Sequence, residues 1–173
     1  MLKATVEKAL NSQINEEYYS SYLYLSMAAY FESLNLQGFA NWMRIQAQEE
    51  YIHSMKFFDY VIHAGGNVTL KAIKEPKTKW KTIVEAFEDT LNHEQHITDL
   101  INKLTSLCLK ESDHATYSFL KWFIDEQVEE MANATQILHE LKLVATNNAG
   151  ILMLDRELKA RTPVMTVVAP AGA

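Results

Sequence analysis

Apolar residues recur every three or four positions along four long stretches of the chain, which is the period of an amphipathic helix. This pattern predicts helices over about residues 5–33, 38–64, 81–110 and 113–145, with a short fifth helix over 151–159. Turn and cap residues separate the stretches, among them Gly65-Gly66 and Ser112-Asp113. The chain of 173 residues has only five Gly and three Pro, which also favours long helices. We therefore predict an all-α fold.

The lengths of the connections indicate how these helices are arranged. A helix of such length spans roughly 40 Å at about 1.5 Å per residue. The connection over residues 67–79 covers about the same distance when extended, at roughly 3.3 Å per residue. The flanking connections are short, so the helices that they join are antiparallel neighbours. We expect a four-helix bundle with one long crossover between helices 2 and 3, forming a single domain over residues 1–160 with a tail over 161–173.

Each apolar stripe contains glutamate near its middle: Glu17, Glu50 with His53 beside it, Glu94, and Glu126 with Glu130. A buried glutamate must be protonated, paired with a cation or bound to a metal. No buried Lys or Arg is expected beside these glutamates, because Arg44 and Lys56 lie near the stripe of the second helix but off its centre. Carboxylate oxygens with one imidazole suit iron or manganese. If the register of one helix were wrong, its glutamate would lie in solvent, and His53 by itself could be an ordinary core histidine. All four helices place glutamate in the apolar stripe, however, and this agreement favours a metal centre.

Composition narrows the class of protein further. Hydrophobic residues make up 48% and charged residues 22% of the chain, as in ordinary globular proteins. The formal net charge of −6 argues against a nucleic-acid partner and suits the attraction of cations. One cysteine, Cys108, excludes a disulfide framework and a four-cysteine metal site. Without an apolar leader or a stretch long enough to cross a bilayer, we expect a cytoplasmic protein with no membrane partner.

Several segments together resemble the prokaryotic non-haem ferritins: Glu17, residues 49–53 (EEYIH), Glu94, residues 126–130 (EQVEE), and the flanking QIN, YLY, HEQ and FLKW stretches. The resemblance covers about residues 2–160. It implies a ferritin-like bundle that binds iron without haem and oxidises Fe(II) with O2 or peroxide. It also implies iron storage and detoxification as ferric mineral inside a hollow homo-oligomeric cage of 24 subunits.

The same resemblance implies roles for individual residues. One iron position would use Glu17, Glu50 and His53, and a second would use Glu50, Glu94 and Glu130, with Glu50 bridging. Gln127 would lie near the iron, and Tyr24 would bond a ligand or donate an electron, although core packing also explains a tyrosine there. A third, inward-facing position would use Glu49, Glu126 and Glu129 with Glu130 shared, and a solvated acidic face is the alternative for these three.

The fourth helix departs from the symmetric di-iron pattern, in which two helices each carry Glu-x-x-His. Glu50-x-x-His53 supplies one such motif, but the second reads Gln127-x-x-Glu130. The second iron position is therefore all-oxygen, which implies that iron passes through it as a substrate. The haem-binding bacterioferritins would have methionine where Tyr51 stands, and rubrerythrin would need a cysteine-rich site. The small Dps-type cages place their ligands differently and lack the fifth helix.

Two alternative functions, one enzymatic and one structural, stay open. A di-iron oxidase acting on an organic substrate would need a cavity beside the metals, and a structural bundle would carry apolar residues at the glutamate positions. The fifth helix, with Ile151, Leu152, Leu154 and Leu158, either packs near the four-fold axes of a cage or folds back on its own bundle. Asp113 and His114 could line a pore, but a helix-capping role is favoured.

Overall fold

The computed structural model describes residues 2–163, which contain helices and no strand. The helices are α1 (Ala4–Ser33), α2 (Gln37–His63), α3 (Ile83–Lys110), α4 (His114–Val144) and α5 (Asn148–Leu158). The predicted all-α fold is confirmed. The predicted tail lies outside the described residues from 164 onward. None of the described helices is both long and apolar enough to cross a membrane.

Two helix starts differ from the prediction by more than one residue, because capping residues set them. The α3 helix begins two residues later than expected, since the Thr82 side chain caps it by accepting from the Glu85 amide. The α5 helix begins three residues earlier, since Asn147 caps the amides of Ala149 and Gly150. Asp113 caps α4 through the Thr116 amide at 3.0 Å, which confirms the capping role favoured from the sequence.

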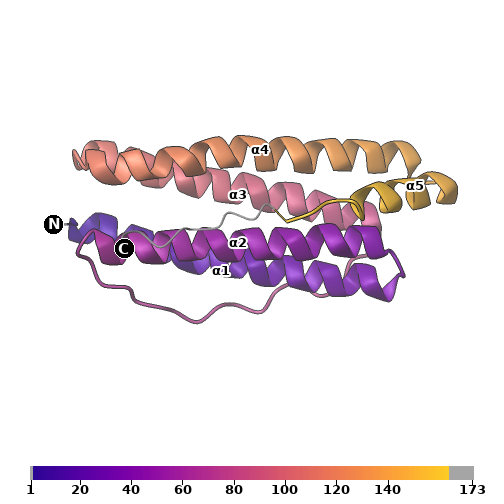
Figure 1. Cartoon of the computed structure of the whole chain (residues 1–173), viewed down its shortest axis with the longest axis horizontal. Coiled ribbons are helices and arrows are strands. Elements are labelled where there is room, and N and C mark those ends of the chain that lie inside the picture. The colour runs from indigo at the N-terminus through magenta and orange to yellow at the C-terminus, as the bar shows by residue number, and fades with distance from the viewer. Residues whose placement is uncertain (1, 164–173) are drawn as a thin grey trace.

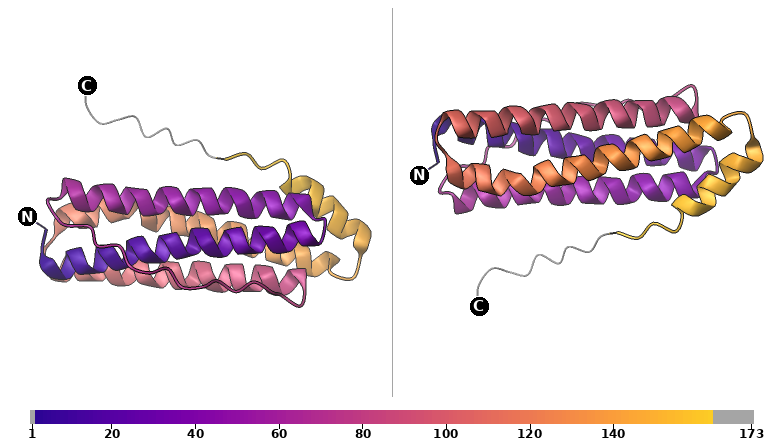
Figure 2. Two further views of the ribbon diagram at one scale, coloured as in Figure 1. Left: turned by 90° about the horizontal axis from the view of Figure 1, so that it is seen from below. Right: turned by 90° about the horizontal axis from the view of Figure 1, so that it is seen from above.

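The four long helices lie side by side as two antiparallel hairpins, α1 with α2 and α3 with α4, and the crossover runs the length of the bundle (Figures 1 and 2). Side chains of α1 hold the crossover in place. Asn11 donates to the Asn67 carbonyl at 2.9 Å and accepts from the Thr69 amide at 2.6 Å. Farther along, Ser26 donates to the Lys77 carbonyl at 2.7 Å. The long connection therefore follows the path that its length predicted.

Three of the long helices are followed by a left-handed residue, which begins the crossover after α2 and the hairpin turns after α1 and α3. Gly65 follows α2 with φ of 75°, and the next amide, of Gly66, donates to the Val61 carbonyl at 2.9 Å. Asn35 after α1 and Ser112 after α3 take the same left-handed conformation. This arrangement satisfies carbonyls that the last helical turn leaves without partners.

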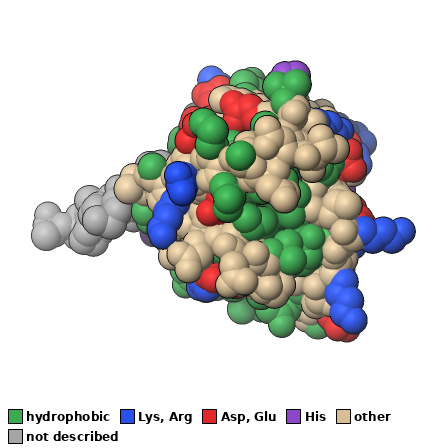
Figure 3. Space-filling model, turned by 90° about the vertical axis from the view of Figure 1, so that its right-hand side faces the viewer, with side chains coloured by type: hydrophobic (Ala, Val, Ile, Leu, Met, Phe, Trp, Pro, Cys, Tyr) green, Lys and Arg blue, Asp and Glu red, His purple; other side chains and the backbone are tan. Residues whose placement is uncertain are grey.

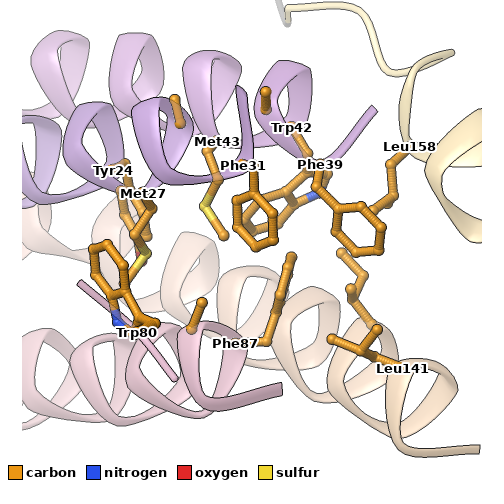
Figure 4. Packing of buried hydrophobic residues seen from close by; sticks show 14 of the residues in the cluster. Tyr24, Met27, Phe31, Phe39, Trp42, Met43, Trp80, Phe87, Leu141 and Leu158 are labelled. Carbon is orange, nitrogen blue, oxygen red and sulfur yellow. The ribbon is translucent and has the colours of Figure 1, made fainter. Parts of the chain in front are cut away.

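The core consists of two apolar clusters with a polar layer between them. One contains Phe31, Phe39 and Phe87 at the α5 end (Figure 4), and the other contains Phe57 and Phe123. On every long helix, the buried glutamates lie in sequence between the stretches that form these clusters. The clusters therefore hold the polar layer in place from both sides, and each buried Phe contributes about 1.5–3 kcal/mol.

The fifth helix docks on its own bundle with one face. Leu154 and Leu158 are buried, and Leu158 lies beside Phe39 in Figure 4. Asp155 accepts from the amide of Gly38 at 2.7 Å at the start of α2, where a side chain on Gly38 would collide with the Asp155 backbone.

The other face of α5 points outward. Leu152 and Met153 are 52% and 62% exposed, and hydrophobic side chains gather near the middle of this end of the molecule (Figure 3). The alternative that the fifth helix folds back on its own bundle is confirmed, and packing near the four-fold axes of a cage stays a prediction. The buried leucines fold back on the bundle, and the exposed residues leave an apolar face.

Candidate metal centre

All four long helices direct buried polar side chains into the layer between the two apolar clusters. They are Glu17 from α1, Glu50 and His53 from α2, Glu94 from α3, and Gln127 and Glu130 from α4, each no more than 5% exposed. Because each side chain falls on the inner face of a regular helix, the apolar stripe that surrounds it determines its direction.

The side chains of Glu17, Glu50 and His53 form the tightest group. One potential ligand atom from each lies within 4.8 Å of the other two. The His53 Nδ1 atom is 3.4 Å from the Glu50 Oε2 atom. Glu17 accepts from the Gln13 amide at 2.7 Å through Oε1, but its Oε2 is buried without a hydrogen-bond partner. An unsatisfied buried oxygen is costly, and a cation bound among these three groups would satisfy it.

Glu94 and Glu130 are held on the opposite side of this group by neutral donors. The Tyr24 hydroxyl donates to Glu94 Oε1, and Gln127 Nε2 lies 3.3 Å from Glu94 Oε2. Gln46 Nε2 donates to Glu130 Oε2 at 2.6 Å and lies 3.5 Å from Glu50 Oε1. Neutral donors orient these carboxylates without cancelling their charge, so the capacity to bind a metal cation is retained.

Burial dominates the electrostatics of the centre. It raises the pKa of Glu17, Glu50, Glu94 and Glu130, and the negative charge of neighbouring carboxylates raises the pKa of Glu17, Glu50 and Glu130 further. Burial and the charge of Glu94 raise the pKa of Tyr24 well above its ordinary value, so the hydroxyl stays a donor. Without metal, the cluster therefore holds protons, and metal binding must release them.

The three residues expected at a third position lie at the edge of the centre. Glu49, Glu126 and Glu129 line a pocket of about 370 Å³ that also reaches His53 and Glu130. The distance from His53 Nε2 to Glu126 Oε1 is 3.9 Å. Glu49 is mostly buried, Glu126 is partly exposed and Glu129 is exposed.

The placement of Glu126 in the core stripe of the fourth helix was wrong. Over residues 123–130 of α4, the buried residues are Phe123, Gln127 and Glu130. The expected stripe stepped from Phe123 to Glu126 by three residues, whereas the helix continues its core face four residues on, at Gln127. A stripe with a step of three or four fits both choices, and only packing against the other helices distinguishes them.

Several neighbours of the centre were absent from the sequence-based site. Gln13 and Gln46 each precede a glutamate of the centre by four residues, so helical spacing could have found them. His93 is 9% exposed and hydrogen-bonds Ser20 at 2.8 Å, and burial lowers its pKa to about 4.

Cations also approach the centre more closely than the sequence indicated. Lys56 lies over the Trp122 ring at 3.0 Å from its centre, and both residues line the pocket beside His53. Arg161, from the segment after α5, pairs with Glu49. No periodic pattern includes Arg161, so helical spacing alone carried no signal for this contact.

The fold and the buried cluster define a four-helix bundle with a carboxylate and imidazole centre that could hold metal ions. The family description "Ferritin-like domain" matches residues 7–144. A bacterial non-heme ferritin of Staphylococcus haemolyticus (strain JCSC1435) is 38% identical over 162 residues, covering 94% of this chain and 98% of the relative. A bacterial non-heme ferritin of Staphylococcus aureus (strain USA300) is 36% identical over the same length. The chain belongs to the ferritin family.

Solved structures of archaeal ferritins are also similar. One, from a study engineering a closed form of the Archaeoglobus fulgidus ferritin, is 47% identical with a TM-score of 0.93, covering 94% of this chain and 99% of that chain. Another, described as a novel open pore ferritin from the same archaeon, is 47% identical with a TM-score of 0.92, covering 93% and 98% of the two chains. The ferritin-like fold expected from the sequence is thereby confirmed, and the family implies a role in iron storage.

Proposed function

We propose that this protein oxidises Fe(II) at a di-iron ferroxidase centre within each subunit and stores the product as ferric mineral in a hollow cage. The observation that carries the proposal is the buried group of Glu17, Glu50 and His53, with one Glu17 oxygen lacking any hydrogen-bond partner. Three ligands of this kind, from two helices, suit a substrate iron ion.

The two iron positions would share Glu50. The first uses Glu17, Glu50 and His53, and the second uses Glu50, Glu94 and Glu130. Hydrogen bonds from Gln46 to both Glu50 and Glu130 support this pairing because they tie the shared ligand to a ligand of the second position. Gln127 and Tyr24 both donate to Glu94, so their part is to orient that carboxylate.

The electrons and protons of iron oxidation at such a centre balance. Each of two Fe(II) ions gives one electron, and the two electrons with two protons reduce O2 to hydrogen peroxide, or peroxide to water. Carboxylates whose pKa is raised by burial would release protons as iron binds. The residues therefore supply charge, geometry and protons, while the iron supplies the electrons.

The outgoing path would lead through the pocket beside His53. Glu49, Glu126 and Glu129 would form the third iron position there, with Glu130 shared with the centre. A pocket lined by this many charged groups suits an inorganic ion better than an organic substrate, which favours storage over an oxidase of organic compounds.

Storage requires a closed shell, for which we propose 24 copies, the number that the resemblance implies. The exposed apolar face of α5 at Leu152 and Met153 supports contacts between copies. The cytoplasmic location and the absence of nucleic-acid partners stay predictions.

The test is aerobic Fe(II) titration of metal-free protein, following ferric absorbance and sedimentation together. The Glu50→Ala, His53→Ala variant should lose the fast phase of oxidation. A matched control, Glu16→Ala with His96→Ala, removes the same residue types from a partly exposed pair 3.5 Å apart and should retain it. Far more than three ions held per chain in a large particle supports storage. Oxidation that stops at two ions on a small oligomer, or equal loss in both variants, contradicts the proposal.

A further inference from the structure

The segment that follows α5 returns to the metal centre and brings a guanidinium group to it. Asn41 of α2 donates to the Arg161 carbonyl at 3.1 Å, which fixes the backbone of this segment. The Arg161 side chain then lies over the Trp42 ring, 4.7 Å from its centre, and is 21% exposed. A cation over an aromatic face and largely removed from water is held in one orientation.

The donors of Arg161 reach three residues of α2: the Trp42 carbonyl at 3.5 Å, and the side chains of Gln46 and Glu49. One terminal nitrogen donates to Gln46 Oε1 at 2.9 Å, and the other donates to Glu49 Oε2. Because a guanidinium has donors and no acceptor, it requires the oxygen of the Gln46 amide to face it. The amide nitrogen must then point inward, where it donates to Glu130 and lies near Glu50. Arg161 thereby orients a group that contacts both carboxylates.

The other contact of Arg161 involves a residue of the third iron position. The pocket beside His53 is lined by the carboxylates of Glu49, Glu126, Glu129 and Glu130, and by two cationic side chains, Lys56 and Arg161. Lys56 lies over the Trp122 ring, whereas Arg161 forms a salt bridge with Glu49. An iron ion that coordinates Glu49 Oε2 competes with the guanidinium for that oxygen, and the two positive charges repel each other.

We propose that Arg161 acts as a resident counter-cation of the third iron position, holding Glu49 until iron replaces the guanidinium. This inference rests on the proposed function and adds to it a regulating contact from the C-terminal segment. The competition keeps the third position weak, so that iron arriving there from the di-iron centre moves on. Arg161 is a positioning residue in this scheme, since it acts through Glu49 and Gln46.

A purely structural role for Arg161 makes a different prediction. If the side chain only fastens the segment after α5, removing it should lower the thermal stability without changing the affinity for a third ion. The counter-cation role predicts that the third ion binds more tightly when Arg161 is removed. Competition with a charge-assisted hydrogen bond corresponds to roughly a tenfold to hundredfold change in affinity.

The test is anaerobic calorimetric titration of the full-length metal-free protein with Fe(II), repeated with Zn(II), which cannot be oxidised. Arg161→Gln should tighten the third ion at least about tenfold relative to the first two ions. Arg161→Lys keeps the charge and should return the affinity towards the wild-type value. Lys159→Gln is the matched control, because it removes one positive charge from the same segment at a residue that contacts Gln37 on the surface.

The outcomes separate this inference from the function on which it rests. Glu49→Gln should abolish the third ion in both the wild-type and the Arg161→Gln backgrounds. An unchanged or weaker third ion in Arg161→Gln, with two ions still bound normally, overturns the counter-cation role alone. An equal effect of Lys159→Gln also overturns it, because general charge would then be the cause. If the wild-type protein binds no pair of ions at all, the proposed function itself fails.

Discussion

Replacing Glu17 by glutamine should make the metal-free protein more stable while weakening its metal binding. The Glu17 carboxylate accepts from Gln13 through one oxygen, and its other oxygen is buried without a partner. Burial and the negative charge of Glu50, whose carboxylate has an oxygen within 4.8 Å, raise the pKa of Glu17. Glutamine can still accept from Gln13, and its amide group can donate to Glu50. The substitution therefore exchanges repulsion for a hydrogen bond.

The size and the pH dependence of this effect follow from the same contacts. A hydrogen bond to a charged group contributes about 1.5–3 kcal/mol. At about 2–4 °C per kcal/mol for a chain of this size, the melting temperature should rise by roughly 3–12 °C. Because folding raises the pKa of Glu17, the carboxyl group contributes stability below the ordinary value of 4.5 and loses it as the pH rises through the folded value. The difference in stability between the variant and the wild type should therefore be smaller at pH 5 than at pH 8.

Differential scanning calorimetry of metal-free wild type and Glu17→Gln at both pH values measures this difference. Glu88→Gln is a matched control, because Glu88 forms an exposed pair with Lys142 at 2.8 Å and lies outside the centre. Adding Zn(II) should reverse the order, since the wild type gains more from the metal than the variant. A lower melting temperature for Glu17→Gln at pH 8, or a gap that does not change with pH, would refute the reasoning.

Three further substitutions test other contacts. Tyr24→Phe removes a hydrogen-bond donor to Glu94. The rate of Fe(II) oxidation, followed by stopped-flow absorbance, should fall by roughly fivefold, which corresponds to about 1 kcal/mol. An unchanged rate would contradict the role of Tyr24 in orienting Glu94. Glu130→His places an imidazole at the histidine position of the second motif, so more oxidised iron should stay at the centre after gel filtration, and unaltered release would exclude this explanation. Leu158→Ala removes a buried contact of α5, worth about 2–5 kcal/mol. Amide exchange should accelerate in α5 but not in α1–α4, and protection unchanged in α5 would show that this contact does not hold the helix.

Long helices and their antiparallel pairing were predictable because periodicity and loop length are local properties of the chain. The same holds for the burial of Glu17, Glu50, Glu94 and Glu130, since each lies in a stripe of apolar residues that must face the core. Helix starts were less predictable. The amide groups of Ala149 and Gly150 are capped by Asn147, which lies in the gap between the predicted fourth and fifth helices.

The sequence by itself determined the bundle, the crossover and the four buried glutamates of the polar layer, because the regular spacing of a helix sets the direction of each side chain. Only the tertiary structure decided which α4 residues complete that layer, since Glu126 and Gln127 both fit a periodic stripe and packing chose Gln127. It alone brought Arg161 to Glu49, which is 112 residues away in the chain. Such a contact depends on where α5 docks and how the chain leaves it, and no local pattern carries that information.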